Sequence, residues 1–342
     1  MDFFTPVVDA QAQHPNFRTI TQVANGFDGD VLMDWARGFE DRDGKFVKEF
    51  QTTFNSSFWE LYIFAVLKSR GLTVDFSYAS PDFVIPGQGG LNIEATVALH
   101  AQDGIPEHMR ANLMIPDDLN ELNRDAILRL SNSISIKRRK FEESYSRLSH
   151  VRGRPFALAV AAFDRPHALA CQRAIEALLH GYYVDEEAFL REGGTLTGKQ
   201  RHSVTKDNGT DIPLGLFSDE SHAWLSAVIF SSCATWGKVA ALSADPNPNR
   251  LFFATRYNAS GVASHVIKAN KSAYQESLLD GLRVYHNPFA FHPLEPSIFR
   301  HRDVFQSYYA DDERGWVYEC RDGVLLHRFT LTIRTAAPSQ HS

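Results

Sequence analysis

The sequence predicts an α/β fold, in which one sheet carries helices on both of its faces. Between residues 51 and 231 the patterns follow the order helix, three strands, helix, strand, helix, strand. Near-continuous apolar runs at 155–163 and 223–230 are typical of strands buried on both faces. Each run is about half of the roughly 18–20 residues that a membrane helix needs. We therefore expect a buried central sheet and no membrane segment.

The chain of 342 residues divides by pattern into three parts. Residues 1–50 form an N-terminal extension with some helix around 30–39. Residues 51–231 form the α/β core. Residues 232–342 form a C-terminal α+β extension of unknown role, with strand-like pieces and a possible short helix; the pieces lie at 250–257, 316–319 and 324–332, and the helix at 274–279.

Composition and charge indicate an ordinary globular protein of the cytoplasm. The net charge of 35 − 41 = −6 argues against a protein that coats nucleic acid non-specifically. Cys171, Cys233 and Cys320 are odd in number and far apart, so they form neither a disulfide framework nor a zinc knuckle. The first residues lack the basic and apolar regions of a secretory signal. These features favour a reducing compartment.

The elements of the core can be placed individually. Capping residues at 55–57 and Gly71 bound the first helix, and alternating residues predict a meander of three strands at 72–78, 81–85 and 91–97. The remaining expectations, in chain order, are a long or broken helix at 117–148, a central strand at 156–163, a helix at 167–179, a loop at 191–218 and a strand at 224–230.

Three carboxylates stand at chemically informative positions in these elements. Glu60 lies on the first helix, Asp82 opens the second strand, and Glu94 lies in the middle of the third strand among apolar residues. A buried carboxylate is costly unless it is paired or holds a cation. Converging carboxylates supply the hard oxygen ligands that Mg²⁺ prefers. The sequence therefore predicts a magnesium site between neighbouring strands.

These residues resemble the motif of the PD-(D/E)XK, or restriction-endonuclease-like, nuclease superfamily. The sequence SPDF at 80–83 matches its PD element, and IEAT at 93–96 matches its ExK element except at the last position. The resemblance covers about 52–231 and implies a core of helix, three-stranded meander, helix and strand. It also implies metal-dependent hydrolysis of phosphodiester bonds.

The resemblance further implies ligands and a substrate. It assigns Asp82, Glu94 and the carbonyl of Ala95 to the metal, with Glu60 as an auxiliary ligand. The metal is expected to be Mg²⁺, with Mn²⁺ able to substitute. The substrate is expected to be DNA rather than RNA. The oligomeric state stays open, with a dimer possible.

Thr96 departs from the motif, because the superfamily usually has a lysine at this position. Thr96 would lie beside the substrate. Some members carry that lysine on the following helix. Lys137 fits this position, because residues 127, 130, 134, 137, 141, 145 and 148 step by three or four along one apolar seam. Lys140 is the second choice. The alternative for Lys137 is a stem that lies on apolar surface with its ammonium in water.

A basic segment follows on the same helix. Residues 133–154 carry seven Lys and Arg against two Glu, a balance of 7 − 2 = +5. Arg138, Arg139 and Lys140 fall at other angles than the apolar seam, so we expect them to face solvent and to contact backbone phosphates. The alternative is an ordinary solvated helix face.

Two other functions stay open. Thr96 could mark a lost lysine, which would leave a degenerate nuclease fold that binds nucleic acid or a protein without cutting. A glycosidase-like pair of carboxylates is the other alternative, and it requires a deep aromatic cleft. Each carboxylate also has an ordinary structural explanation. Asp82 could stabilise a turn, Glu94 could be a solvated residue of an edge strand, and Glu60 could be a favourable charge at a helix N-terminus.

Overall fold

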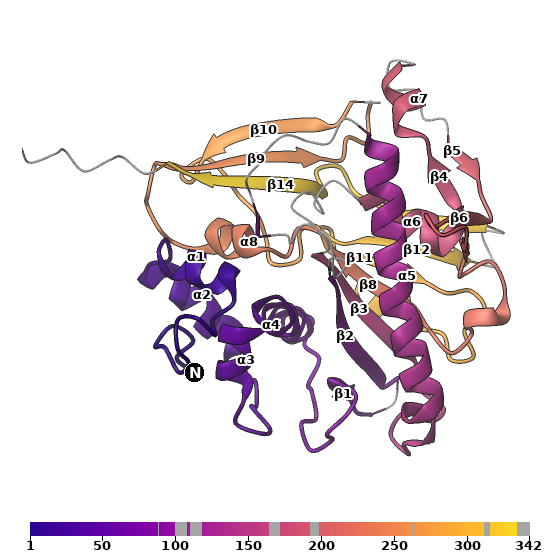
Figure 1. Cartoon of the computed structure of the whole chain (residues 1–342), viewed down its shortest axis with the longest axis horizontal. Helices are drawn as coiled ribbons and strands as arrows, with labels where there is room; N and C mark the ends of the chain where they lie inside the picture. Colours follow the sequence, from indigo (N-terminus) through magenta and orange to yellow (C-terminus); the bar gives the residue numbers. More distant parts are fainter. Residues whose placement is uncertain are drawn as a thin grey trace, which may run out of the picture.

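The chain folds into a mixed α/β protein built on a seven-stranded mixed sheet (Figure 1). The computed structural model describes residues 1–87, 89–99, 108–109, 118–163, 172–191, 198–261, 263–310 and 315–333. The strands, in their order across the sheet, are β1 (Phe83–Ile85), β2 (Leu91–Leu99), β3 (Phe156–Phe163), β8 (Ala227–Ser231), β11 (Arg283–His286), β12 (Phe305–Ala310) and β13 (Gly315–Glu319). Strands β2, β3 and β8 run parallel, as do β11 and β12, and the other neighbours are antiparallel.

One face of the sheet packs against α4 (Phe54–Ser69). Strand β3 presents Ala157, Ala159 and Ala161 to this face, and all three are fully buried. Small side chains allow the helix to approach the strand closely. The indole nitrogen of Trp59 consequently donates a hydrogen bond of 2.9 Å to the carbonyl of Ala159.

The opposite face packs against α5 (Leu119–Glu143) and α6 (Gln172–His180). Leu158 and Val160 of β3 point to this side, where they share a core with Ile127 of α5. Strand β3 is therefore buried on both faces, and the expected placement of helices on both sides of the sheet is confirmed (Figure 1).

The N-terminal residues belong to the same core as α4. Their helices are α1 (Pro15–Thr21), α2 (Gly26–Ala36) and α3 (Phe46–Thr52). They lie beside α4 (Figure 1), and their buried aromatic residues contact those of α4. Helix α2 is the helix expected near residues 30–39, although it begins and ends several residues earlier.

The C-terminal residues complete the main sheet and add a second one. Strands β11, β12 and β13 extend the main sheet beyond β8. A separate antiparallel sheet has the order β10–β9–β14 and lies beside α8 (Figure 1). These elements are α8 (Trp236–Leu242), β9 (Arg250–Arg256), β10 (His265–Asn270) and β14 (Leu325–Thr332). The strands expected at 250–257, 316–319 and 324–332 are thereby confirmed.

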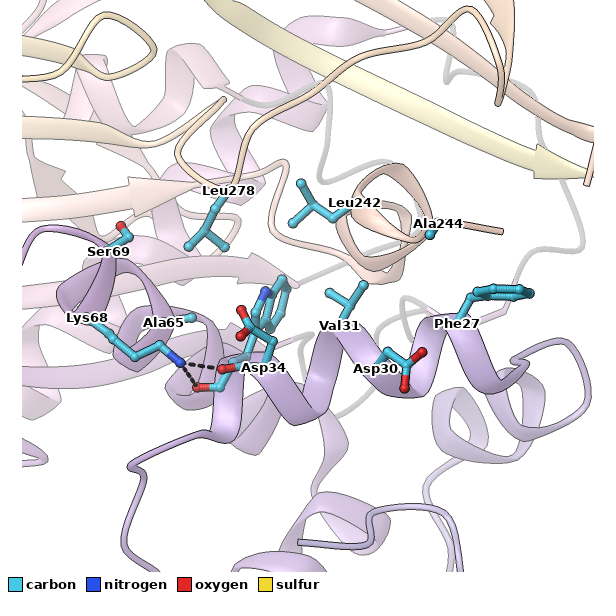
Figure 2. A pocket seen from close by; sticks show the side chains of 11 residues that line it. Phe27, Asp30, Val31, Asp34, Ala65, Lys68, Ser69, Leu242, Ala244 and Leu278 are labelled. Carbon is cyan, nitrogen blue, oxygen red and sulfur yellow. Dashed lines mark hydrogen bonds between the residues drawn. The ribbon is translucent and has the colours of Figure 1, made fainter. Parts of the chain in front are cut away.

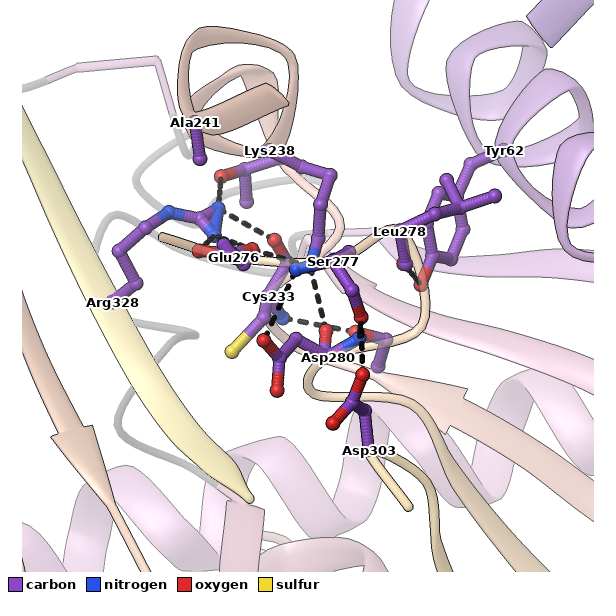
Figure 3. Close-up of polar contacts among 12 residues, drawn as sticks. Tyr62, Cys233, Lys238, Ala241, Glu276, Ser277, Leu278, Asp280, Asp303 and Arg328 are labelled. Carbon is purple, nitrogen blue, oxygen red and sulfur yellow. Dashed lines mark hydrogen bonds and ion pairs between the residues drawn. The ribbon is translucent and has the colours of Figure 1, made fainter. Parts of the chain in front are cut away.

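A cluster of buried charges joins this second sheet to the rest of the protein (Figure 3). The side chains of Lys238, Glu276 and Arg328 are completely buried. Glu276 is paired with Lys238 and, at 2.9 Å, with Arg328. Lys238 also donates to the carbonyls of Ser277 and Asp280. A buried charge is tolerated only when it is paired in this way, so the cluster fixes α8 and β14 to the loop at 271–282.

Three expectations about local structure are wrong. Residues 72–78 form an irregular segment with a turn at 76–77 rather than a strand, and the N–H of Asp75 donates to the carbonyl of Val84 without a continuous ladder. The meander is therefore reduced to the β1–β2 hairpin. Residues 274–279 form no helix, and the carbonyl of Ser277 instead accepts a hydrogen bond from Lys238. The expected loop at 191–218 contains strands of two small hairpins.

The elements of this region are β4 (Tyr182–Val184), α7 (Glu186–Arg191), β5 (Gly198–Gln200), β6 (Ser203–Thr205) and β7 (Asp211–Pro213), with β4 pairing with β5 and β6 with β7. The described residues also include short 3-10 helices at Tyr145–Arg147 (η1), Glu220–His222 (η3) and Pro296–Ile298 (η4). The first part of the helix expected at 167–179 and Cys171 lie outside the described residues. In the described part of the chain, every helix is too short or too polar to cross a membrane.

Candidate active site

Asp82 and Glu94 lie side by side at one edge of the main sheet. Phe83 pairs with Ile93, so Asp82, directly before β1, stands opposite Glu94. Opposite residues of an antiparallel pair point to the same side of the sheet. Asp82 Oδ2 accepts a hydrogen bond of 2.7 Å from the backbone N–H of Ala95, which ties the loop before β1 to β2.

Glu94 is the centre of a polar cluster. Its Oε1 accepts hydrogen bonds from the ammonium groups of Lys137 at 2.7 Å and Lys140 at 3.0 Å. Its Oε2 accepts one of 2.9 Å from the hydroxyl of Tyr145. Glu94 is almost completely buried, and burial alone would raise its pKa. Lys137 and Lys140 outweigh this effect and hold the pKa below its ordinary value, so the carboxylate is ionised at neutral pH.

The two lysines come from neighbouring positions on α5. Lys137 continues the apolar seam, as the spacing indicates, and its ammonium reaches Glu94 rather than water. Lys140 is three residues further along, on the adjoining part of the helix surface. Lys140 is exposed, as expected for the basic face, but its flexible stem also brings the ammonium to Glu94. Arg138 pairs instead with Glu142 at 2.8 Å.

The remaining acidic residue, Glu60, places a third carboxyl group close to this pair from α4. Burial and the charge of Asp82 raise the pKa of Glu60 to about 8. Burial and the charge of Glu94 likewise raise the pKa of Asp82 to about 6. Arg42, from the loop after α2, opposes the rise at Glu60. Glu60 and Asp82 therefore behave as acids crowded together with too little positive charge nearby.

The donor chemistry of this site fits a hard divalent cation. Mg²⁺ is commonly held by one or two carboxylates, with waters and substrate phosphate completing its shell. Asp82 and Glu94 supply such a pair, and Asp82 Oδ1 has no hydrogen-bond partner among the described residues. Across the described ranges, no three acidic, histidine or cysteine side chains converge closely enough to hold a metal ion. Glu60 thus does not complete a chelating triad.

The other predicted site residues lie around this pair. Ala95 is adjacent to Glu94 and contacts Asp82 through its N–H. Thr96 lies two residues beyond Glu94 on β2, hence on the same face of the strand, and is partly buried. Arg139 is exposed on α5. The structure therefore brings together Asp82, Glu94, Lys137 and Lys140, and leaves Arg138 and Arg139 at the surface.

Two residues of this site were missed in the sequence. The helical spacing places Tyr145 in the apolar seam and does not reveal a polar role. A tyrosine at such a position nevertheless carries a hydroxyl that needs a hydrogen-bond partner. His150 gives no local signal. Its Nε2 lies 2.8 Å from the carbonyl of Ser80, and its ring centre lies 4.0 Å from that of Tyr78, with the ring planes tilted by 31°. The segment 137–150 therefore contacts both Glu94 and the loop that carries Asp82.

A surface pocket of about 520 Å³ lies elsewhere, between α2, α4 and the end of α8 (Figure 2). Its walls are mainly apolar and include Val31, Trp35 and Leu242. Lys68, on its rim, donates to backbone carbonyls at the end of α2, including those of Trp35 and Arg37. None of the predicted site residues lines this pocket, so it has no connection to the carboxylate pair.

No protein family, curated protein or solved structure matches this chain.

Proposed function

We propose that the chain is a metal-dependent nuclease of the PD-(D/E)XK type that hydrolyses phosphodiester bonds, with DNA as the preferred substrate. The observation that carries the proposal is the distance of 2.7 Å between Lys137 Nζ and Glu94 Oε1. Thr96 leaves the motif without its lysine, and an ammonium from α5 lies beside the motif glutamate instead. Two carboxylates and an ammonium beside a basic surface suit phosphoryl chemistry.

The order of the elements also supports this type of core. Helix α4, the β1–β2 hairpin, α5, β3, α6 and β8 follow the order of the superfamily core. The first strand of the meander is the part that differs, since residues 72–78 form an irregular segment. The motif residues themselves lie on the β1–β2 hairpin and do not depend on that strand.

In the proposed reaction, Asp82 and Glu94 would hold Mg²⁺ or Mn²⁺, with the carbonyl of Ala95 as an auxiliary ligand and the carboxyl of Glu60 near Asp82 but outside the chelating set. The chemistry that such a cation would supply is polarisation of the scissile phosphate and a lower pKa for a bound water. Lys137 orients the attacking water through a hydrogen bond and offsets the negative charge that develops on the phosphate. Because water attacks directly, no covalent enzyme intermediate is required.

The substrate contacts follow from the surface beside the site. Arg139, Arg147 and Arg152 are exposed along and after α5. Exposed guanidinium groups bind backbone phosphates and release counterions, so binding is expected to weaken as salt rises. Arg138 is already paired with Glu142 and contributes less.

A second function is favoured by the saturation of Glu94. Both oxygens of this carboxylate already have donors, from Lys137, Lys140 and Tyr145. A protein that has lost catalysis would keep such a closed cluster as a structural feature. The alternative is therefore a nuclease fold that binds nucleic acid or a protein partner without cutting.

A cleavage assay separates the two functions. Supercoiled plasmid and single-stranded DNA are incubated with wild type, Asp82→Asn and a control, Lys268→Met, in Mg²⁺, Mn²⁺ or EDTA. Lys268 is an exposed lysine of β10, remote in sequence from the site. The nuclease proposal expects cleavage by wild type and control only with metal, and none by Asp82→Asn. DNA binding without cleavage in every condition would instead support the degenerate protein.

A further inference from the structure

Two ammonium groups share a single oxygen of Glu94. Lys137 and Lys140 both donate to Oε1, while Tyr145 donates to Oε2. Glu94 has only one negative charge, so the second ammonium adds a positive charge that this carboxylate does not need for neutrality. Oε1 is the Glu94 oxygen nearest to the two ammonium groups, so a metal cation that approaches Oε1 is repelled by them.

The two lysines are not equivalent. The Lys137 side chain is 18% exposed and its contact is shorter, at 2.7 Å. The Lys140 side chain is 48% exposed and its contact is 3.0 Å. Releasing Lys137 would leave a mostly buried ammonium without its partner, which is costly. Releasing Lys140 costs little, because water can solvate a half-exposed ammonium and exposed ion pairs contribute little free energy.

Tyr145 makes Lys140 easier to release from Glu94. Lys140 Nζ lies 4.8 Å from the centre of the Tyr145 ring, over its face. The ring attracts a cation whether or not that cation also touches Glu94. Lys140 can therefore withdraw toward solvent along the ring, while Tyr145 keeps its hydrogen bond to Glu94 Oε2.

We propose that Lys140 is an exchangeable cation that occupies Glu94 in the metal-free protein and leaves when the site binds a divalent cation. This inference rests on the proposed metal dependence of the site. Lys137 stays in contact with Glu94 or moves to the attacking water, whereas Lys140 is released and becomes available to a substrate phosphate. The released lysine thus links metal binding to the capture of nucleic acid.

Direct titration with Mn²⁺ tests this assignment without any cleavage. Binding is measured by calorimetry for wild type, Lys140→Met, Lys140→Gln and the matched control Lys268→Met, the exposed lysine of β10. Removal of the competing ammonium is expected to tighten Mn²⁺ binding about tenfold in both Lys140 variants. Lys268→Met is expected to change the Mn²⁺ affinity less than about twofold. Thermal melting followed by circular dichroism establishes that each variant is folded.

A double-mutant cycle with Glu94→Gln isolates the shared oxygen. If Lys140 acts through Glu94, Lys140→Met gives no gain in Mn²⁺ affinity in the Glu94→Gln protein. Mn²⁺ binding that is equal or weaker in Lys140→Met than in wild type overturns the exchange. Absence of Mn²⁺ binding in all variants overturns the proposed metal site itself, and the exchange with it.

Discussion

Replacing Glu60 by glutamine is expected to change the pH dependence of stability. Burial and Asp82 raise the pKa of Glu60 to about 8 in the folded protein, from an ordinary value of 4.5. At intermediate pH the folded protein therefore keeps a proton on Glu60 that the unfolded chain releases. The stabilisation from this proton is complete below the ordinary pKa and is lost as the pH rises through about 8.

The magnitude follows from these two values. Between about pH 6 and pH 9 the loss from a single carboxyl of this kind is about 2 to 3 kcal/mol of the free energy of unfolding. That is a substantial part of the roughly 5–15 kcal/mol that stabilises a typical domain. Glu60→Gln has no proton to lose, so its stability is expected to change less over this range.

Equilibrium unfolding in urea, with EDTA present, measures this difference. The free energy of unfolding is determined at about pH 6 and pH 9 for wild type and Glu60→Gln. Wild type is expected to lose about 2 to 3 kcal/mol more than the variant. Parallel pH profiles for the two proteins would refute the placement of Glu60 in a buried acidic environment.

Two further predictions concern residues that support the fold and the site. Lys238→Met leaves the buried carboxylate of Glu276 with one partner fewer. We expect it to lower the free energy of unfolding, measured in urea, by about 3–5 kcal/mol, and a loss below about 1 kcal/mol would contradict the buried cluster. His150→Ala removes the contact with the carbonyl of Ser80. We expect it to cost about 1 kcal/mol of stability and, because the loop that carries Asp82 loosens, to weaken Mn²⁺ binding. Unchanged Mn²⁺ binding in calorimetry would exclude this positioning role.

Much of the α/β layout could be predicted because its signals are local. The apolar run of β3 and the helical spacing of α5 appear within short windows of sequence. The position of Lys137 followed from the same spacing, since a residue in an apolar seam must face the sheet. The partner of Lys137 could be named only through the motif residue Glu94, which is 43 positions away in the chain.

Other features depend on contacts that short windows do not contain. Residues 72–78 alternate like a strand, yet a strand also needs a continuous partner, and these residues have none in the described structure. Strands β11 to β13 join the main sheet from the C-terminal third of the chain. The bond between Tyr145 and Glu94 joins residues 51 positions apart, so Tyr145 gave only its apolar signal.

The most direct test of the central claim concerns Lys137 as the replacement for the motif lysine. Single-turnover cleavage of DNA is compared for wild type, Lys137→Met and the control Lys268→Met, together with Mn²⁺ and DNA binding. We expect Lys137→Met to retain both kinds of binding but to lose about 10²–10³-fold in cleavage rate, while the control cleaves like wild type. Cleavage by Lys137→Met at the wild-type rate would show that Lys137 does not replace the motif lysine.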